Sequence, residues 1–153
     1  MIYKILTVIM VAAAPLSELR GAIPLGIDIF KLNRGLVVAI SILGNLLPAL
    51  AIAFFFEPLI DLFSKRIPVF HKFLLKHLET ARHKTKKAVD RYGLFGLIIF
   101  IAVPLPLFGV YTGAAGAVLL GMPRRRIMLA SVVGVAIAAL IVFTIDAALG
   151  KLF

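Results

Sequence analysis

The sequence has no cysteine, which excludes disulfide bonds and thiolate metal sites. It also has little charge, since 16% of its 153 residues are charged and 62% are hydrophobic. A soluble domain of this length has too little interior to bury so many apolar side chains. The apolar residues also form long continuous blocks, as a lipid bilayer requires. The composition therefore predicts one all-α integral membrane domain over residues 1–153.

Acidic residues are scarce, with 7 Asp and Glu against 17 Lys and Arg, so the formal net charge is +10. Such an excess of basic residues is compatible with binding to nucleic acid or to anionic lipid headgroups. Here the basic residues lie beside the hydrophobic blocks, which is typical of segments at a membrane surface. We therefore expect membrane lipids as partners and no nucleic acid.

The hydrophobic residues fall into four blocks. Two of them, 35–63 and 127–149, are each long enough for a helix across a hydrocarbon core of about 30 Å. The other two, 2–30 and 94–122, are interrupted near their middle by residues that stop a helix. These residues are Pro15, Pro24, Pro104, Pro106 and Gly109. Each half of an interrupted block reaches only to about the middle of a bilayer.

The distribution of basic residues predicts how the interrupted blocks lie. If both are re-entrant hairpins that enter and leave by one face, the segment 64–91 and the triplet Arg124–Arg126 share a face, which then holds 12 of the 17 basic residues. If both blocks cross the bilayer, these two basic segments lie on opposite faces. Because basic segments stay in the cytoplasm, hairpins are favoured. The segment 64–91 and the triplet are then cytoplasmic, and both termini lie outside.

The two halves of the chain share one order of elements. Repeat 1 (1–63) has hairpin 2–30 and transmembrane helix 35–63. Repeat 2 (92–153) has hairpin 94–122 and transmembrane helix 127–149. Three residues of repeat 1 also recur at an offset of 90: Arg34, Ser41 and Gly44 correspond to Arg124, Ser131 and Gly134. Since each half crosses the bilayer once, the second half begins on the opposite face. This predicts an inverted repeat, which is typical of secondary transporters.

The segment 64–91 joins the two repeats. Its apolar residues recur at helical spacing with lysines and arginines opposite: Phe70, Phe73, Leu74, Leu78 and Ala81. This pattern predicts an amphipathic helix in the cytoplasmic interface, ended by Gly93. Three histidines in or near this pattern, His71, His77 and His83, are six residues apart and do not share a helical face. We therefore expect no metal site.

Glu18 and Arg20 lie at the interruption of the first block, where a charge in hydrocarbon costs about 2.5 to 3.5 kcal/mol. Either a structural ion pair at the hairpin tip or a ligand site in a water-filled cavity accounts for them. In a re-entrant hairpin the second half-helix begins at the tip, so its N-terminal N–H groups point into the cavity. We expect these helices to begin near Gly21 and near Thr112 or Gly113, with the two tips facing each other.

Arg20 and two helix N-termini together predict a site for an anion such as phosphate. Glu18 is then a counter-charge or the residue that couples transport to protons. Tyr111 and Thr112 are candidates to donate hydrogen bonds to a ligand, while glycines beside them either admit the ligand or permit close helix packing. The predicted substrate-binding residues are Glu18, Arg20, Gly21, Tyr111, Thr112 and Gly113. The apolar blocks contain no arrangement typical of an enzyme, and no cofactor is expected.

The stretch Ser17-Glu18-Leu19-Arg20-Gly21-Ala22-Ile23-Pro24, with Pro104-Leu105-Pro106 and Gly109-Val110-Tyr111-Thr112-Gly113, resembles the small multidrug export protein family of prokaryotes. The resemblance covers essentially the whole chain and implies an inner-membrane exporter.

A more distant resemblance is to the DedA (VTT-domain) superfamily, whose two facing hairpins carry a Pro-x-Glu-type motif and a Pro-Gly-x-Arg-Thr motif. Here Ser17-Glu18 is similar to the first motif, but Tyr111 stands where the second has arginine. The resemblance implies a transporter or flippase of lipid-linked phosphates.

Three functions follow as hypotheses. The first is a small secondary transporter or lipid flippase that binds a phosphate headgroup between the hairpin tips and is coupled to protons. The second is an exporter of cationic, amphipathic compounds with Glu18 as the binding charge, although Arg20 would then repel the substrate. The third is a non-transporting membrane scaffold in which the two charges only hold the fold. Because so few helices provide little interior, we expect a homodimer or larger homo-oligomer.

Overall fold

The computed structural model describes residues 1–66, 68–104 and 109–149, with side chains except those of 57–78. These ranges contain helices and no strand, which confirms the all-α class. The elements in order are α1 (Ile2–Ala12), α2 (Glu18–Pro24), the π-helix η1 (Leu25–Ile29), α3 (Arg34–Arg66), α4 (Pro68–Ala102), α5 (Val110–Leu119) and α6 (Arg124–Leu149).

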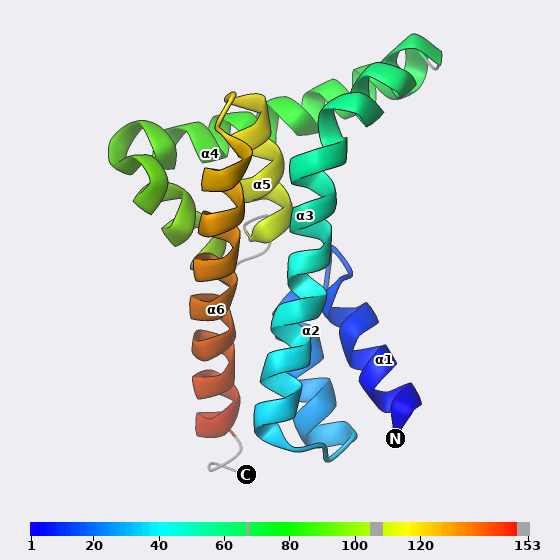
Figure 1. Ribbon diagram of the computed structural model, residues 1–153, viewed down its shortest axis with the longest axis vertical. Helices are drawn as coiled ribbons and strands as arrows, with labels where there is room; N and C mark the ends of the chain where they lie inside the picture. The colour runs from blue at the N-terminus through cyan, green and yellow to red at the C-terminus, as the bar shows by residue number, and fades with distance from the viewer. Residues whose placement is uncertain (67, 105–108, 150–153) are drawn as a thin grey trace.

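Two helices are long and apolar enough to cross a membrane: the Arg34–Phe56 part of α3, and α6. They correspond to the two uninterrupted blocks predicted from the sequence. The two helices run in opposite directions along the long axis of the molecule (Figure 1). The helix of the block 35–63 is longer than predicted, since α3 continues to Arg66 and α4 begins at Pro68. The predicted boundary at residue 63 was therefore too early, because the polar residues that follow 63 continue the helix.

The first interrupted block forms a hairpin of helices. α1 runs from the N-terminus to the middle of the molecule, and α2 with η1 returns to the same end (Figure 1). The free ends of the two arms are joined by a hydrogen bond of 3.2 Å from Lys4 Nζ to the Phe30 carbonyl. The Tyr3 ring also packs edge-on against the Phe30 ring. Pro15 lies in the turn between the arms, as predicted.

Pro24 does not break the helix, contrary to the prediction. It is the last residue of α2, and the chain continues directly into the π-helical turn η1. A proline lacks the N–H that would bond to the carbonyl four residues earlier. A change to π-helical hydrogen bonding accommodates such a local defect without ending the helical path.

The second interrupted block also folds back on itself. The first part of α4 lies across one end of the molecule, and the chain turns at Gly93, where φ is 57° and ψ is −129° (Figure 1). The part of α4 after Gly93 runs inward to Ala102, and α5 returns to the same end (Figure 1). Gly93 therefore ends the connector helix as predicted. Pro104 follows the end of α4, while Pro106 lies outside the described residues.

In each half, a glycine of the long helix is closely approached by the first arm of the hairpin. A Cβ atom on Gly44 of α3 would lie 2.7 Å from the Ile9 carbonyl oxygen of α1. A Cβ atom on Gly134 of α6 would lie 2.7 Å from side-chain atoms of Ile101 in α4. Both distances are shorter than any normal carbon contact, so only glycine fits at these two positions. Gly44 and Gly134 are the pair related by the offset of 90 in the sequence.

We expect Gly44→Ala to destabilise the protein by about 1–3 kcal/mol, because the added methyl group overpacks a contact with backbone that cannot move aside. Gly35→Ala is the matched control, since its Cβ would meet only Asn33 Oδ1, at 3.3 Å. Thermal unfolding of the purified variants in detergent measures the difference. Equal unfolding temperatures for the two variants would contradict the close packing of α1 on α3.

Candidate functional site

The turns of the two hairpins meet in the middle of the molecule. Glu18 is the first residue of α2, and Gly109 is the N-cap of α5. A Cβ atom on Gly109 would lie 2.6 Å from Glu18 Oε2 and 2.9 Å from Oε1. The carboxyl group of Glu18 therefore lies directly on the backbone at the start of α5, and this contact requires glycine at 109.

The Glu18 side chain is enclosed by protein, with 8% of its surface exposed. Within the described ranges no hydrogen bond to its carboxyl oxygens is found. Burial of the Glu18 carboxyl group opposes its ionisation, whereas the N-terminus of α5 beside it favours a negative charge. This is the place where the sequence led us to expect a phosphate, and the protein's own carboxylate occupies it.

Glu18 also has a strained backbone, with φ at 46°. A non-glycine residue in this left-handed region costs roughly 1–2 kcal/mol. Such strain persists only where the surrounding structure holds the residue, and it is found preferentially at functional sites. The strained backbone therefore indicates that the position of the Glu18 side chain is important for function.

Tyr111 and Thr112 fasten the second hairpin to its neighbours. The Tyr111 hydroxyl donates to the Ala13 carbonyl at the end of the first arm of the other hairpin. The Thr112 carbonyl accepts a hydrogen bond of 3.3 Å from Thr85 Oγ1 of α4. Tyr111 thus ties one hairpin tip to the other. Thr112 takes part through its backbone, so the contacts show no direction for its hydroxyl.

Arg20 contacts a different residue of the second hairpin from the one that Glu18 contacts. Residues two apart on a helix lie on different faces, and Arg20 Nη1 donates a long hydrogen bond of 3.5 Å to the Pro104 carbonyl. Arg20 also lines a cavity of about 250 Å³ between α2 and α6. It is near enough to act electrostatically on Glu18, but no ion pair joins the two in the part of the chain that the structure describes. Arg20 therefore contacts the second hairpin at Pro104 and Glu18 contacts it at Gly109, and an anion site that combines Arg20 with the start of α5 stays a prediction.

Two glycines of the predicted site are explained by packing within the hairpins. A Cβ on Gly21 would lie 2.8 Å from Ser17 Cβ, and a Cβ on Gly113 would lie 2.6 Å from Ile101 Cγ1. In both hairpins the returning arm thus packs tightly on a neighbouring segment. The helices also begin earlier than expected, at Glu18 instead of near Gly21 and at Val110 instead of near Thr112. Glu18 and Arg20 consequently belong to the first turn of a helix and not to an irregular loop.

Sequence reasoning missed Thr85 in this region. It lies in the basic segment of α4 but is fully buried, and a Cβ on Gly116 of α5 would collide with its side chain. A signal was present, because Thr85 follows Ala81 by four residues and so continues the apolar face of the connector helix. Thr85 was not included in that face because lysines and arginines surround it in the sequence.

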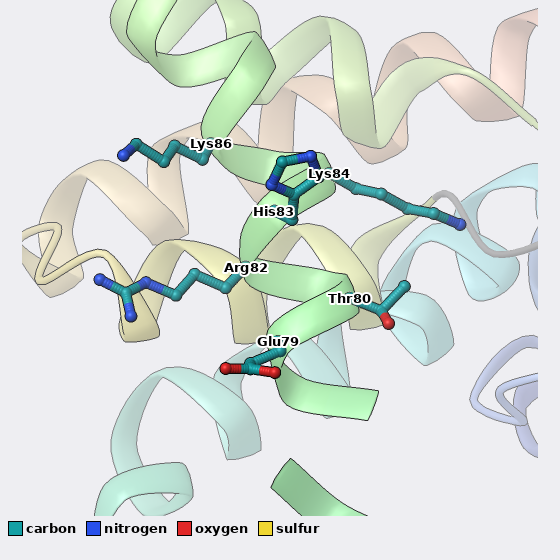
Figure 2. Close-up of a pocket in the computed structure, with 6 residues that line it drawn as sticks. All are labelled: Glu79, Thr80, Arg82, His83, Lys84 and Lys86. Atoms are coloured by element: carbon teal, nitrogen blue, oxygen red, sulfur yellow. The ribbon is translucent and has the colours of Figure 1, made fainter. Parts of the chain in front are cut away.

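The surface of α4 carries a broad hollow of about 690 Å³. Figure 2 shows that Arg82 and Lys86 extend to one side of the helix and Thr80 and Lys84 to the other. Because these side chains diverge, the hollow is a charged helix surface and not a site that converges on a ligand. In the described residues no group of three or more potential metal ligands is present. The side chains of His71 and His77 lie outside the described set.

Comparison with known proteins identifies a family. The model of the family described as "Putative small multi-drug export protein" matches residues 18–141, which is most of the chain. No curated protein and no solved structure matches the chain. The more distant similarity to the DedA superfamily is not shown by these comparisons. The match begins at Glu18, so it includes both hairpin tips apart from the first residues of the first turn.

Proposed function

Since the chain belongs to the small multi-drug export protein family, we propose that it is a membrane transporter that exports amphipathic cations in exchange for protons. Glu18 is the carboxyl group that proton and substrate share. The observation that carries this proposal is the enclosure of that carboxyl group between the two hairpin tips, against the backbone of Gly109. An ionisable side chain at such a depth in a membrane protein is costly, and it is usually functional.

A single enclosed carboxyl group provides a simple exchange mechanism. When ionised it attracts a cation, and when protonated it releases the cation, so proton and substrate exclude each other. The divergence of Arg20 supports a cationic substrate, because its guanidinium is directed to Pro104 and not into the contact between Glu18 and Gly109. The repulsion that Arg20 would exert on a cation at Glu18 is thereby reduced.

We further propose that both helical hairpins are re-entrant and that the two halves form an inverted repeat. Three features support this topology: each hairpin returns to the end at which it began, the tips meet in the middle, and Gly44 and Gly134 make equivalent close contacts (Figure 1). The basic segment of α4 and the start of α6 lie at one end of the molecule (Figure 1). Because basic segments stay inside, this end faces the cytoplasm of a prokaryotic inner membrane, and both termini face outside.

Purified protein in liposomes tests the transport proposal. The vesicles are loaded with tetraphenylphosphonium as the cationic probe, and a proton gradient is imposed across the membrane. Release of the probe should require the protein and should follow the gradient, collapsing when an uncoupler is added. Release that is independent of the gradient, or absent under both conditions, would refute the exchange mechanism.

A flippase of lipid phosphates is the second candidate, and Arg20 favours it. The guanidinium group borders a cavity between α2 and α6 and binds phosphate well. Liposomes that contain a fluorescent polyprenyl phosphate test it, because a reductant added outside bleaches only the outer leaflet. Bleaching beyond the outer half would favour the flippase over the exporter. If neither probe moves, the third hypothesis of a membrane scaffold is favoured.

The turn of the first hairpin also supports a homodimer. Leu16 is 94% exposed in this turn, which lies at about half the depth of the molecule (Figure 1). Irregular backbone at membrane depth is tolerated where protein covers it and not where lipid surrounds it. We therefore propose that a second copy of the chain covers this turn.

Because the chain has no native cysteine, a single Leu16→Cys variant tests the dimer by disulfide cross-linking in membranes. We expect a cross-linked dimer on a non-reducing gel. The control is Leu140→Cys, which is 63% exposed on α6, a helix that lies on the opposite side of the molecule from α1 (Figure 1). A monomeric Leu16→Cys variant, or equal cross-linking of both variants, would contradict a dimer formed through this turn.

A further inference from the structure

A cavity of about 250 Å³ lies between α2 and α6, separate from the contact between Glu18 and Gly109. Its walls are largely apolar, and the charged groups that line it within the described residues are Arg20 and Asp146. Along α6 it extends from Val142 to Leu149, which is about 10 Å at the rise of a helix. Ile145 and Leu149 are half-exposed, so the cavity is open near the C-terminal end of α6.

The charges at the two ends of this cavity differ. Arg20 lies at the inner end, where it is bonded to the Pro104 carbonyl next to the hairpin tips. Asp146 lies near the outer end, where the carboxyl group of Asp28 in η1 is close enough to act on it electrostatically. Arg34, at the start of α3, is the cation that acts on Asp146. Two neighbouring carboxyl groups repel each other when both are ionised, so such a pair favours binding of a proton between them.

The size of the cavity limits what can enter it. Pockets for drug-sized ligands usually measure about 300–1,000 Å³, so this cavity is too small for a large amphipathic cation. A water molecule needs only about 10–15 Å³ of such volume, so the cavity has room for several. The charged groups at its two ends provide partners for water, and hydration also lowers the cost of placing Arg20 at this depth.

We propose that this cavity is an outward-facing, water-filled vestibule through which protons reach the hairpin tips, and that the carboxyl pair Asp28–Asp146 binds protons at its mouth. The inference rests on the proposed exchange function and adds the route of the proton. The exporter needs such a route, because a proton that replaces the cation on Glu18 has to arrive from outside.

Labelling of single cysteines tests whether water fills the vestibule. Val142→Cys is nearly isosteric and lies in the cavity wall, where its side chain is 7% exposed. Leu140→Cys is the control at nearly the same depth, but it lies on an exposed face of α6. A charged methanethiosulfonate reagent reacts with thiolates, which form in water and not in lipid. Added from outside, it should label Val142→Cys at least about tenfold faster than Leu140→Cys.

A rate for Val142→Cys no faster than that for Leu140→Cys would overturn the vestibule. Ile145→Cys, also in the wall, replaces Val142→Cys if that variant is unstable.

Infrared spectra test the carboxyl pair: the C=O band of a protonated carboxyl group should weaken in both Asp146→Asn and Asp28→Asn, but not in Glu79→Gln on the exposed surface of α4. An unchanged band in both would refute the proton-binding mouth. None of these measurements needs a substrate. A negative result would therefore refute the vestibule alone, whereas a negative efflux assay would refute the exchange function.

Discussion

Replacing Glu18 by glutamine should reduce proton-driven efflux of tetraphenylphosphonium at least about 100-fold, which is the usual lower range for loss of a proton-transferring group. Glutamine has nearly the same shape as glutamic acid but neither binds a proton nor attracts a cation by charge. The side chain is enclosed between the hairpin tips, so water cannot replace its function there. Efflux from liposomes under an imposed proton gradient measures the effect.

The matched control is Glu79→Gln, which makes the same chemical change on an exposed part of α4. We expect this variant to transport at the wild-type rate. Circular dichroism and gel filtration in detergent should show that both variants are folded. An amide at position 18 has no charge but nearly the same volume as the carboxyl group that it replaces. Wild-type efflux by a folded Glu18→Gln variant would refute the role of Glu18 in exchange. If that variant still moved a lipid phosphate, the Arg20 cavity of the flippase hypothesis would gain support.

Replacing Gly109 by alanine should produce a large loss of stability, because the new methyl group adds backbone strain to a close contact. The backbone at Gly109, with φ at 120° and ψ at −168°, is in a region that costs other residues about 1–3 kcal/mol. The new Cβ would also lie 2.6 Å from Glu18 Oε2, and such overpacking adds typically 1–3 kcal/mol. This sum is a large part of the roughly 5–15 kcal/mol that holds a typical protein folded.

Gly121→Ala separates these two contributions. Gly121 also has a positive φ, 71°, but a Cβ there would have no neighbour within 4 Å. We expect it to cost only backbone strain, about 1–2 kcal/mol. In detergent, the unfolding temperature of Gly121→Ala should therefore be higher than that of Gly109→Ala. The double variant Glu18→Ala with Gly109→Ala should recover part of the loss, because it removes the carboxyl group from the contact. Absence of any recovery would show that the two hairpin tips do not press on each other there.

Local breaks in the helices could be predicted from the sequence alone. Pro15, Pro104 and Gly93 end or bend helices where expected, because each acts through its own backbone, whatever surrounds it. Pro24 did not, since a π-helical turn absorbed the missing hydrogen bond. The effect of Pro24 depended on whether the following turn could change its hydrogen bonds. The sequence pattern does not show whether a turn can do so.

The charges at the first hairpin were found from the sequence, but their arrangement was not. Glu18 and Arg20 were expected in one site, and the early start of α2 places them on different faces of a helix. One faces Gly109 and the other faces Pro104, and both of these partners are more than 80 residues away along the chain. The pairing of Asp28 with Asp146 and the burial of Thr85 are likewise contacts between distant segments.

Composition and spacing by themselves determined that this is a helical chain with two long apolar helices and two interrupted blocks, and they located the costly charges. These properties follow from hydrophobicity and from the backbone chemistry of proline and glycine, which act within a few residues. Only the tertiary structure decided which group each charge meets. That choice depends on the rotation of a helix about its axis and on close approach at glycine. A shift of one residue in where α2 begins changes the face on which Glu18 lies.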